Sequence, residues 1–327
     1  MTTSPLLEVD GLGVTFSTPR GEIRVVDDVS FDIAAGECVG LIGESGSGKS
    51  VTALSLVRLL SRASYEGRVR FDGRDLLDLA EAELKQVRGG RIGFVFQDPM
   101  ACLNPALTIG FQVAEPARLH LGMSKKESLD HAAELLDRVG IARARDRLRD
   151  HPHQLSGGMR QRVMIAIALA ARPGLIIADE PTTALDVTIQ AQILDLIREV
   201  STQTDAAVLM ITHDLGIAAG LCDRVNVMYA GQIVERAGTS ELFAAPEMPY
   251  TWGLLDSLPR MDDPRGTRLR SIPGSPPTPP AVSDRCRFLP RCPYSRDRCG
   301  ETAPVLTERV DGHTARCLGT EPMGWIA

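Results

Sequence analysis

Long hydrophobic runs are missing from this sequence. The longest unbroken apolar stretch is VMIAIALAA, residues 163 to 171, which is half of the roughly 18 residues that a membrane-spanning helix needs. The opening segment, MTTSPLLEVD, also lacks the basic start and the apolar centre of a secretory signal. We therefore expect neither a membrane span nor a secretory leader, so that any role at a membrane comes through a partner.

An excess of positive charge is also missing. The formal net charge is −6, and an acidic chain is a poor partner for a nucleic-acid backbone, so no nucleic-acid binding is expected. The charge is uneven, because residues 260 to 327 carry eleven Arg, no Lys and eight acidic residues, a net of +3. Hydrophobic residues make up 43% of the chain, which is enough for a packed core.

Apolar periodicity predicts alternating strands and helices. β-Branched residues in alternation indicate strands at residues 6–16 and 23–33. Continuous apolar runs indicate buried strands at residues 37–43, 92–96, 175–179 and 206–212. Helical spacing of apolar residues occurs at residues 50–60, 124–140, 159–173 and 188–202. This alternation predicts a parallel sheet covered on both faces, closed by a hairpin that turns near Ala230 and Gly231.

The stretch GESGSGKS matches the pattern G-x-x-x-x-G-K-[ST] between a predicted buried strand and a predicted helix. Backbone N–H groups of such a loop surround phosphates, and the helix start adds partial positive charge. Lys49 is expected to reach the β- and γ-phosphates, and the Ser50 hydroxyl to bind Mg²⁺. The alternative is a glycine-rich turn with an incidental lysine. The predicted nucleotide-binding residues are Gly43, Glu44, Ser45, Gly46, Ser47, Gly48, Lys49, Ser50 and Val51.

A second acidic motif, LIIADE, ends the predicted strand at residues 175–179. The tips of parallel strands are where ligands sit in open α/β sheets. Asp179 therefore suits a role near Mg²⁺, and Glu180 suits the general base that activates the attacking water. The alternative is a solvated strand end, which the four preceding apolar residues and the following Pro181 make a weaker interpretation.

The segment LSGGM, residues 155 to 159, opens another predicted helix with two glycines, and such a start also suits an anion. With these motifs in this order, the chain resembles the ATP-binding subunits of ABC transporters over about residues 7 to 240, with Met159 where that family commonly has glutamine. The resemblance implies that the signature loop, Ser156, Gly157 and Gly158, closes on the ATP held by a partner subunit.

Further positions are assigned by the same resemblance. Gln97 matches the glutamine that senses Mg²⁺ and water, and Asp186 matches the loop that crosses the dimer interface. His213 matches the histidine that contacts the γ-phosphate. Phe16 is the candidate to stack on adenine, with a core phenylalanine as the alternative.

The resemblance implies an α/β P-loop fold with a mainly parallel central sheet, an antiparallel N-terminal β subdomain and an α-helical signature subdomain. The expected boundaries are an ATPase domain at residues 1–240, which includes the helical subdomain at about residues 98–170, and a C-terminal extension at residues 241–327. In that extension, SIPGSPPTPPAVSD predicts a semi-rigid proline-rich strap that leads to a group of cysteines.

The segments QDPMACLNPALTIGFQ, PYTWGLL and IPGSPP are similar to those of the ATPases of bacterial dipeptide and oligopeptide importers. Cys102 and Met248 depart from that pattern, which has serine and histidine there. The resemblance implies a peripheral subunit on the cytoplasmic face of the inner membrane. Its partners would be a second homologous ATPase in a heterodimer, two transmembrane permease subunits and an extracytoplasmic peptide-binding protein.

Other functions fit parts of the same pattern. Nickel importers and importers of other small solutes share much of the core. A soluble iron–sulfur ABC ATPase that acts on nucleic acid or the ribosome is a second alternative, and a redox sensor with an attached ATPase is a third. The acidic charge of the first 259 residues and the single ATPase unit argue against the nucleic-acid alternative.

Four cysteines end the chain: Cys286, Cys292, Cys299 and Cys317, with five, six and seventeen residues between them. Clustered thiols in a reducing compartment more often bind metal than form disulfides. Structural zinc sites prefer two to four residues between paired cysteines, whereas iron–sulfur clusters accept irregular spacing. The resemblance implies a 4Fe–4S cluster with a structural role. A zinc site, in which His313 could replace one thiolate, and unliganded thiols remain the alternatives. The flanking arginines are expected to offset the cluster's negative charge: Arg285, Arg287, Arg291, Arg296 and Arg298.

Overall fold

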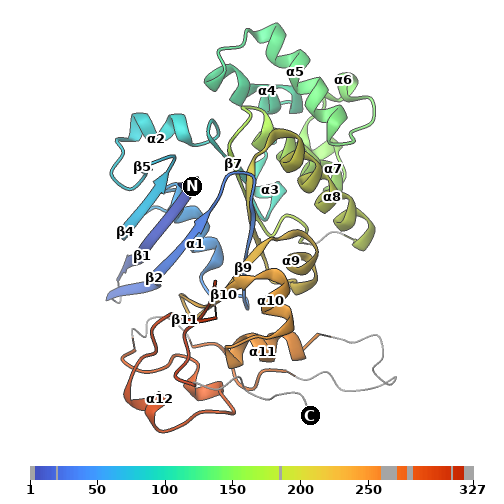
Figure 1. The fold of residues 1–327 in the computed structure, drawn as a ribbon. Helices are drawn as coiled ribbons and strands as arrows, with labels where there is room; N and C mark the ends of the chain where they lie inside the picture. The colour runs from blue at the N-terminus through green and yellow to red at the C-terminus, as the bar shows by residue number, and fades with distance from the viewer. Residues whose placement is uncertain are drawn as a thin grey trace. The chain divides into compact units, whose positions relative to one another are not determined.

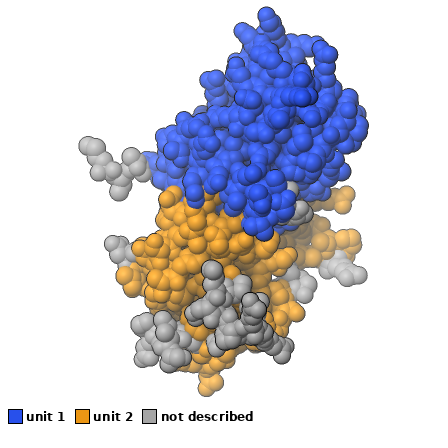
Figure 2. Space-filling view, turned by 90° about the vertical axis from the view of Figure 1, so that its right-hand side faces the viewer, with its two compact units in different colours: residues 1–6, 33–38, 78–211 blue, residues 7–32, 39–77, 212–327 orange. Residues whose placement is uncertain are grey.

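The computed structural model describes residues 4–19, 21–183, 186–258, 271–277, 283–310 and 312–319. The chain forms two compact units, which Figure 2 shows in blue and orange. Unit 1 comprises residues 1–6, 33–38 and 78–211, and unit 2 comprises residues 7–32, 39–77 and 212–327. Part of the predicted proline-rich strap, residues 278–282, lies outside the described residues.

A four-stranded sheet in unit 2 has the order β2-β1-β4-β5. Its strands are β1 (Leu7–Thr18), β2 (Gly21–Ile33), β4 (Ala63–Phe71) and β5 (Arg74–Asp75). β1 and β4 are antiparallel, with Leu7 opposite Phe71, and β4 and β5 are also antiparallel. Leu7 and Val9 are buried at alternate positions of β1, as period-two patterning requires, and a register shift between Asp10 and Gly13 separates them from the buried Val14. The predicted antiparallel N-terminal sheet is therefore present.

The other strands of unit 2 follow the order β11-β12-β10-β9-β3. They are β3 (Cys38–Ile42), β9 (Arg224–Tyr229), β10 (Gln232–Gly238), β11 (Thr307–Val310) and β12 (His313–Ala315). β3 and β9 are parallel, whereas β9, β10, β12 and β11 pair antiparallel in turn. The antiparallel strands beyond β9 make the sheet mixed, whereas the pairing of β3 and β9 is parallel, as predicted.

The hairpin between β9 and β10 turns at Ala230 and Gly231, both of which have positive φ, 48° and 84°. Two positive φ angles are typical of the tight turn that matches strand twist. The helices of this unit are α1 (Lys49–Leu56), α9 (Leu215–Leu221), α10 (Thr239–Ala244), α11 (Pro249–Asp256) and α12 (Arg298–Glu301), with a 3₁₀ turn at Leu289–Arg291.

Unit 1 contains three parallel strands in the order β8-β7-β6. They are β6 (Ile92–Val95), β7 (Leu175–Asp179) and β8 (Ala207–Thr212). Every residue of β7 and β8 is buried, which explains why their sequences are continuous apolar runs instead of alternating ones.

Seven helices of unit 1 are described: α2 (Glu81–Val87), α3 (Pro99–Cys102), α4 (Ile109–His120), α5 (Lys125–Arg138), α6 (Ala144–Arg147), α7 (Gly157–Leu169) and α8 (Val187–Thr204). α4, α5 and α7 pack against one another in the green part of Figure 1 around buried residues such as Ile109, Leu136 and Val163. Ser124 and Glu127 form a capping box that begins α5. Among the described helices of both units, none is long and apolar enough to cross a membrane.

Candidate functional site

The glycine-rich loop lies in unit 2 between β3 and α1, with the geometry of a phosphate cradle. A Cβ at Gly43 would lie 2.2 Å from the carbonyl oxygen of Met228, so only glycine fits there. Gly46 has φ 79°, and a Cβ built there would meet nothing within 4 Å. The loop is therefore tightly packed where Gly43 faces Met228, and it is open where Gly46 has no neighbour within 4 Å. Backbone N–H groups and the start of α1 are available to an anion on that open side.

Lys49 begins α1, and its side chain spans the loop. It is 5% exposed, and its Nζ donates to the carbonyl oxygens of Gly43, at 2.8 Å, and Glu44, at 3.0 Å. Gly231 N–H donates to the Ser47 carbonyl, at 2.8 Å, so the β9–β10 turn also holds the loop. These contacts fix the loop's shape, as a preorganised binding site requires.

Two residues that sequence reasoning missed also hold the loop. The Glu44 N–H donates to the Tyr250 hydroxyl of α11 at 2.8 Å, and the Glu44 carboxylate pairs with Arg291. Burial raises the pKa of Tyr250 above its ordinary value, so the phenol stays neutral. Tyr250 lies in PYTWGLL and Arg291 among the cysteines, and neither segment carries a pattern that points to residue 44.

The acidic tip of β7 lies in unit 1. Asp179 is 5% exposed and ends the strand. Glu180 has a positive φ of 45°, and its N–H donates to the Ile211 carbonyl at 2.9 Å. A left-handed non-glycine residue is strained, and such strain is concentrated at functional sites.

The structure brings Gln97 and Glu180 together, although sequence reasoning reached them by separate routes. Gln97 Nε2 donates to Glu180 Oε2 at 2.9 Å, and Thr183 Oγ1 donates to the same oxygen at 2.9 Å. Thr183 was missed, although it lies three residues after Glu180. Two donors on one oxygen fix the direction of the Glu180 carboxylate.

Two further predicted residues of unit 1 lie at exposed helix starts. Ser156 caps α7, and its hydroxyl accepts from Met159 N–H at 3.3 Å. Asp186 caps α8 and accepts from Ile189 N–H at 3.0 Å. Gly157 is exposed, and Gly158 is close to α8, because a Cβ there would lie 3.1 Å from Ile189. These starts face outward, where a partner can reach them.

The remaining predicted nucleotide contacts are in unit 2. His213 is exposed and directly follows β8. Its neighbour Asp214 caps α9 by accepting from two backbone N–H groups. Phe16 lies near the end of β1 opposite Ala63 and is half-buried, so part of its ring is accessible for stacking.

The four C-terminal cysteines lie in unit 2 and are half-buried. Cys286 N–H donates to the Cys299 carbonyl at 3.1 Å, and Gly319 N–H donates to Cys317 Sγ at 3.3 Å. Burial raises the pKa of Cys286, and it raises that of Cys292 to about 11, with the other thiols of the group adding to each shift. Within the described ranges, no three His, Cys, Asp or Glu side chains are arranged to hold a single metal ion.

Three side chains near the cysteines have other partners than the sequence suggested. His313 is buried, and its Nε2 lies 2.7 Å from Glu235 Oε1. Arg287 pairs with Asp27 and Arg291 with Glu44. These two guanidinium groups therefore neutralise carboxylates of the ATPase domain rather than facing solvent.

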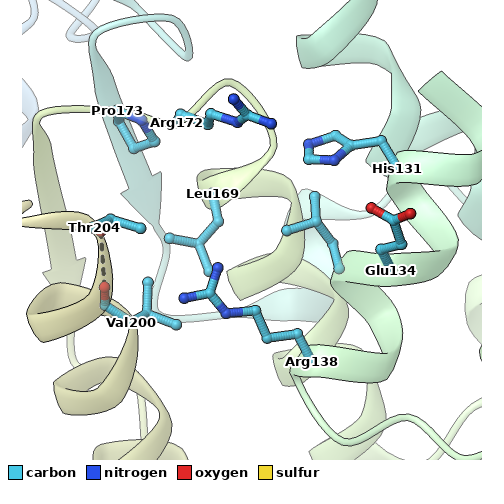
Figure 3. Close-up of a pocket in the computed structure, with 9 residues that line it drawn as sticks. His131, Glu134, Arg138, Leu169, Arg172, Pro173, Val200 and Thr204 are labelled. Atoms are coloured by element: carbon cyan, nitrogen blue, oxygen red, sulfur yellow. Dashed lines mark hydrogen bonds between the residues drawn. The ribbon is translucent and has the colours of Figure 1, made fainter. Parts of the chain in front are cut away.

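A cavity of about 410 Å³ opens in unit 1 among α5, α8 and the turn before β7 (Figure 3). Its walls combine apolar Leu169 and Val200 with the polar groups of His131, Arg138 and Arg172. His131 Nε2 is 3.0 Å from the Ala170 carbonyl, so the imidazole is tied to the wall. No predicted site residue lines this cavity, so the expected nucleotide chemistry lies elsewhere.

Comparison with known proteins places the chain in a family. The model of the ABC transporter family matches residues 26–183, and that of the oligopeptide/dipeptide transporter C-terminal region matches residues 234–299. The chain is 48% identical to the oligopeptide transport ATP-binding protein OppD of Salmonella typhimurium, over 96% of this chain and 93% of that protein. It is 47% identical to the oligopeptide transport ATP-binding protein AppD of Bacillus subtilis, over 98% of each.

The chain belongs to the ATP-binding subunits of oligopeptide and dipeptide ABC transporters. Solved structures agree with this membership of the transporter ATPases. The dimeric ATP-binding cassette MJ0796, bound to ADP and Pi, matches with a TM-score of 0.65 and 31% identity, over 71% of this chain and 98% of that chain. The protein cbiO1 of Clostridium perfringens, part of an ABC transporter complex, matches with a TM-score of 0.63 and 28% identity, over 74% and 92%. The fold is that of an ABC ATPase, and the activity is ATP hydrolysis.

Proposed function

We propose that this ATPase powers the import of dipeptides and oligopeptides. The observation that carries this proposal is the match of residues 234–299 to the C-terminal region of oligopeptide and dipeptide transporters, in addition to the ATPase match. The partners are two permease subunits, an extracytoplasmic peptide-binding protein and a second homologous ATPase. The subunit acts at the cytoplasmic face of the inner membrane and binds no nucleic acid.

Each predicted site residue has its own role in the proposed hydrolysis. The loop Gly43–Val51 surrounds the phosphates, Lys49 contacts the β- and γ-phosphates, and Phe16 stacks on adenine. Ser50, Gln97 and Asp179 suit Mg²⁺, which supplies charge neutralisation between the phosphate oxygens. These are the oxygen donors that this hard cation prefers.

Glu180 accepts the proton of the attacking water. Its direction is set by the hydrogen bonds from Gln97 and Thr183 to one oxygen. His213 contacts the γ-phosphate from the end of β8. The Glu180 carboxylate, the Gln97 amide and the His213 imidazole would thus be positioned in advance for the charge that develops in the transition state.

Hydrolysis requires a second ATPase chain. Ser156, Gly157 and Gly158 approach the γ-phosphate bound by the partner, and Asp186 lies at the interface between the chains. The exposure of these two helix starts supports this proposal. The corresponding domain assignment is an ATPase domain at residues 1–240, with its helical subdomain at about 98–170, followed by the extension at 241–327.

We further propose that Cys286, Cys292, Cys299 and Cys317 hold a 4Fe–4S cluster that cross-links the extension. Four thiols in one segment supply a full ligand set. Structural zinc sites prefer two to four residues between paired cysteines, whereas iron–sulfur clusters accept irregular spacing, and the gaps here are five, six and seventeen residues.

The proposals are tested by gentle detergent extraction of the tagged full-length chain. Recovery of two permease subunits whose complex moves peptides supports the import function. A complex that carries nickel but not peptides, or recovery of RNA, contradicts it. Anaerobic purification should give a brown protein with about four iron and four sulfide per chain, and Cys292→Ser should remove the colour. Colourless protein with about one zinc per chain contradicts the cluster.

A further inference from the structure

Three aromatic rings join the cysteine segment to the ATPase domain within unit 2. Tyr229 at the end of β9 and Tyr250 of α11 have ring centroids 4.5 Å apart. Phe288, between the first two cysteines, meets these rings edge-on at 5.2 and 5.5 Å. Phe288 is 2% exposed. The segment therefore packs on the domain through this ring, and its position is fixed relative to β9.

Arg291 extends from this anchored segment to the phosphate loop. Its Nη1 lies 2.7 Å from Glu44 Oε2, and its Nη2 lies 3.0 Å from Glu44 Oε1. Its Nε donates to the Pro273 carbonyl at 2.9 Å, and its Cζ lies 5.7 Å from the centre of the Tyr229 ring. The Arg291 side chain is 4% exposed. A two-pronged, buried guanidinium–carboxylate pair is directional, so it fixes the orientation of Glu44.

Glu44 is thereby held at two points by residues from the C-terminal part of the chain. The backbone N–H of Glu44 donates to the Tyr250 hydroxyl, and Arg291 donates to the Glu44 carboxylate. The pair also has an electrostatic consequence. An unpaired carboxylate in a loop that receives phosphates repels them. Arg291 cancels that negative charge.

We propose that Arg291 is a positioning residue for ATP: it fixes Glu44 and neutralises it, so that the cysteine segment sets the ATP affinity of the phosphate loop. The proposal rests on the assignment of Gly43–Val51 as the ATP-binding loop. It does not depend on a metal in the cysteine segment, because every contact that carries it is made by side chains and backbone of the chain itself.

The test is equilibrium binding of a fluorescent ATP analogue with Mg²⁺ to the full-length chain. Arg291→Met should weaken binding about tenfold, which corresponds to about 1.4 kcal/mol. Glu44→Gln introduced into Arg291→Met removes the unpaired charge, and it should restore affinity to within about threefold of the parent chain. Such rescue reports coupling between the two residues, which a general loss of structure does not produce.

The matched control is Arg145→Met in unit 1, which breaks the exposed Arg145–Asp130 pair and should leave ATP affinity unchanged. Wild-type affinity in folded Arg291→Met, or a double variant as weak as the single one, overturns the proposal. If Arg291→Met does not fold, Arg291→Lys is measured instead. Lysine keeps the positive charge but cannot make both hydrogen bonds to the Glu44 carboxylate, so this variant should bind ATP a few-fold more weakly. Lys49→Ala with undiminished binding shows instead that the loop assignment itself is wrong.

Discussion

Removal of the Glu235 carboxylate should destabilise the C-terminal part of unit 2. Glu235 is fully buried in β10. Its two oxygens accept from the backbone N–H groups of Glu247 and Met248, at 2.5 and 3.1 Å, and Oε1 also lies 2.7 Å from His313 Nε2. One side chain thus joins β10, the start of α11 and β12. Glu235→Ala leaves two buried N–H groups and an imidazole without their partner.

The expected magnitude follows from these three contacts. A hydrogen bond to a charged group contributes about 1.5–3 kcal/mol, and removal of one partner from a buried pair costs about 3–5 kcal/mol. We therefore expect Glu235→Ala to lower the free energy of unfolding by about 3–5 kcal/mol. Glu235→Gln keeps the shape and one acceptor, so about 1–2 kcal/mol is expected.

Urea denaturation followed by circular dichroism measures both variants, and hydrogen exchange at the Glu247 and Met248 amides localises the effect. Because Met248 precedes the helix that carries Tyr250, Glu235→Ala should also weaken ATP binding. The control is Glu8→Ala, which removes a 43% exposed carboxylate that pairs with Arg70 and should cost at most about 1 kcal/mol. Equal losses in Glu235→Ala and Glu8→Ala would refute the reasoning.

Two further predictions concern stability against pH and action between chains. Burial alone raises the Asp32 pKa, but the hydrogen bond from Arg224 and the charges of Arg236 and Arg224 hold it below its ordinary value. A lowered carboxyl pKa stabilises the fold above the unfolded value of about 3.9, and this contribution is lost as the pH falls through the folded pKa. Asp32→Asn should therefore be less stable than the parent at pH 7, with a gap in urea midpoint that closes below about pH 4; a constant gap contradicts this. In a forced homodimer, a Lys49→Ala chain mixed with a Ser156→Ala chain should recover one working ATPase site, and no recovery in any combination argues against action in trans.

Local patterns predicted much of the fold and of the site. The phosphate loop, the acidic end of β7 and the glycine start of α7 are each encoded by contiguous residues, so their sequences identify them. Strand direction is not encoded in this way, because a buried strand has the same apolar run whether the adjacent strand is parallel or antiparallel to it. The antiparallel hairpin of β9 and β10 was predicted, but the antiparallel strands β12 and β11 beside it were not. β11 and β12 were missed because they are four and three residues long.

Contacts between distant parts of the chain could not be predicted. Arg291 and Glu44 are 247 residues apart, and Tyr250 and Glu44 are 206 apart. Their pairing depends on the burial of Phe288 against Tyr229, which only the folded topology provides. The same reason applies to His313, which looked like a spare metal ligand in the sequence and is bonded to Glu235 in the structure.

The central claim is that hydrolysis at Glu180 drives peptide import. The direct test is ATP-dependent uptake of a labelled peptide by the complete importer in proteoliposomes, with the partner ATPase site disabled. Glu180→Gln keeps the shape of the side chain but cannot take a proton from water, so uptake and turnover should fall to near background while ATP stays bound. Uptake at the parent rate in the Glu180→Gln complex, or no peptide uptake by the parent complex while it hydrolyses ATP, would contradict the account.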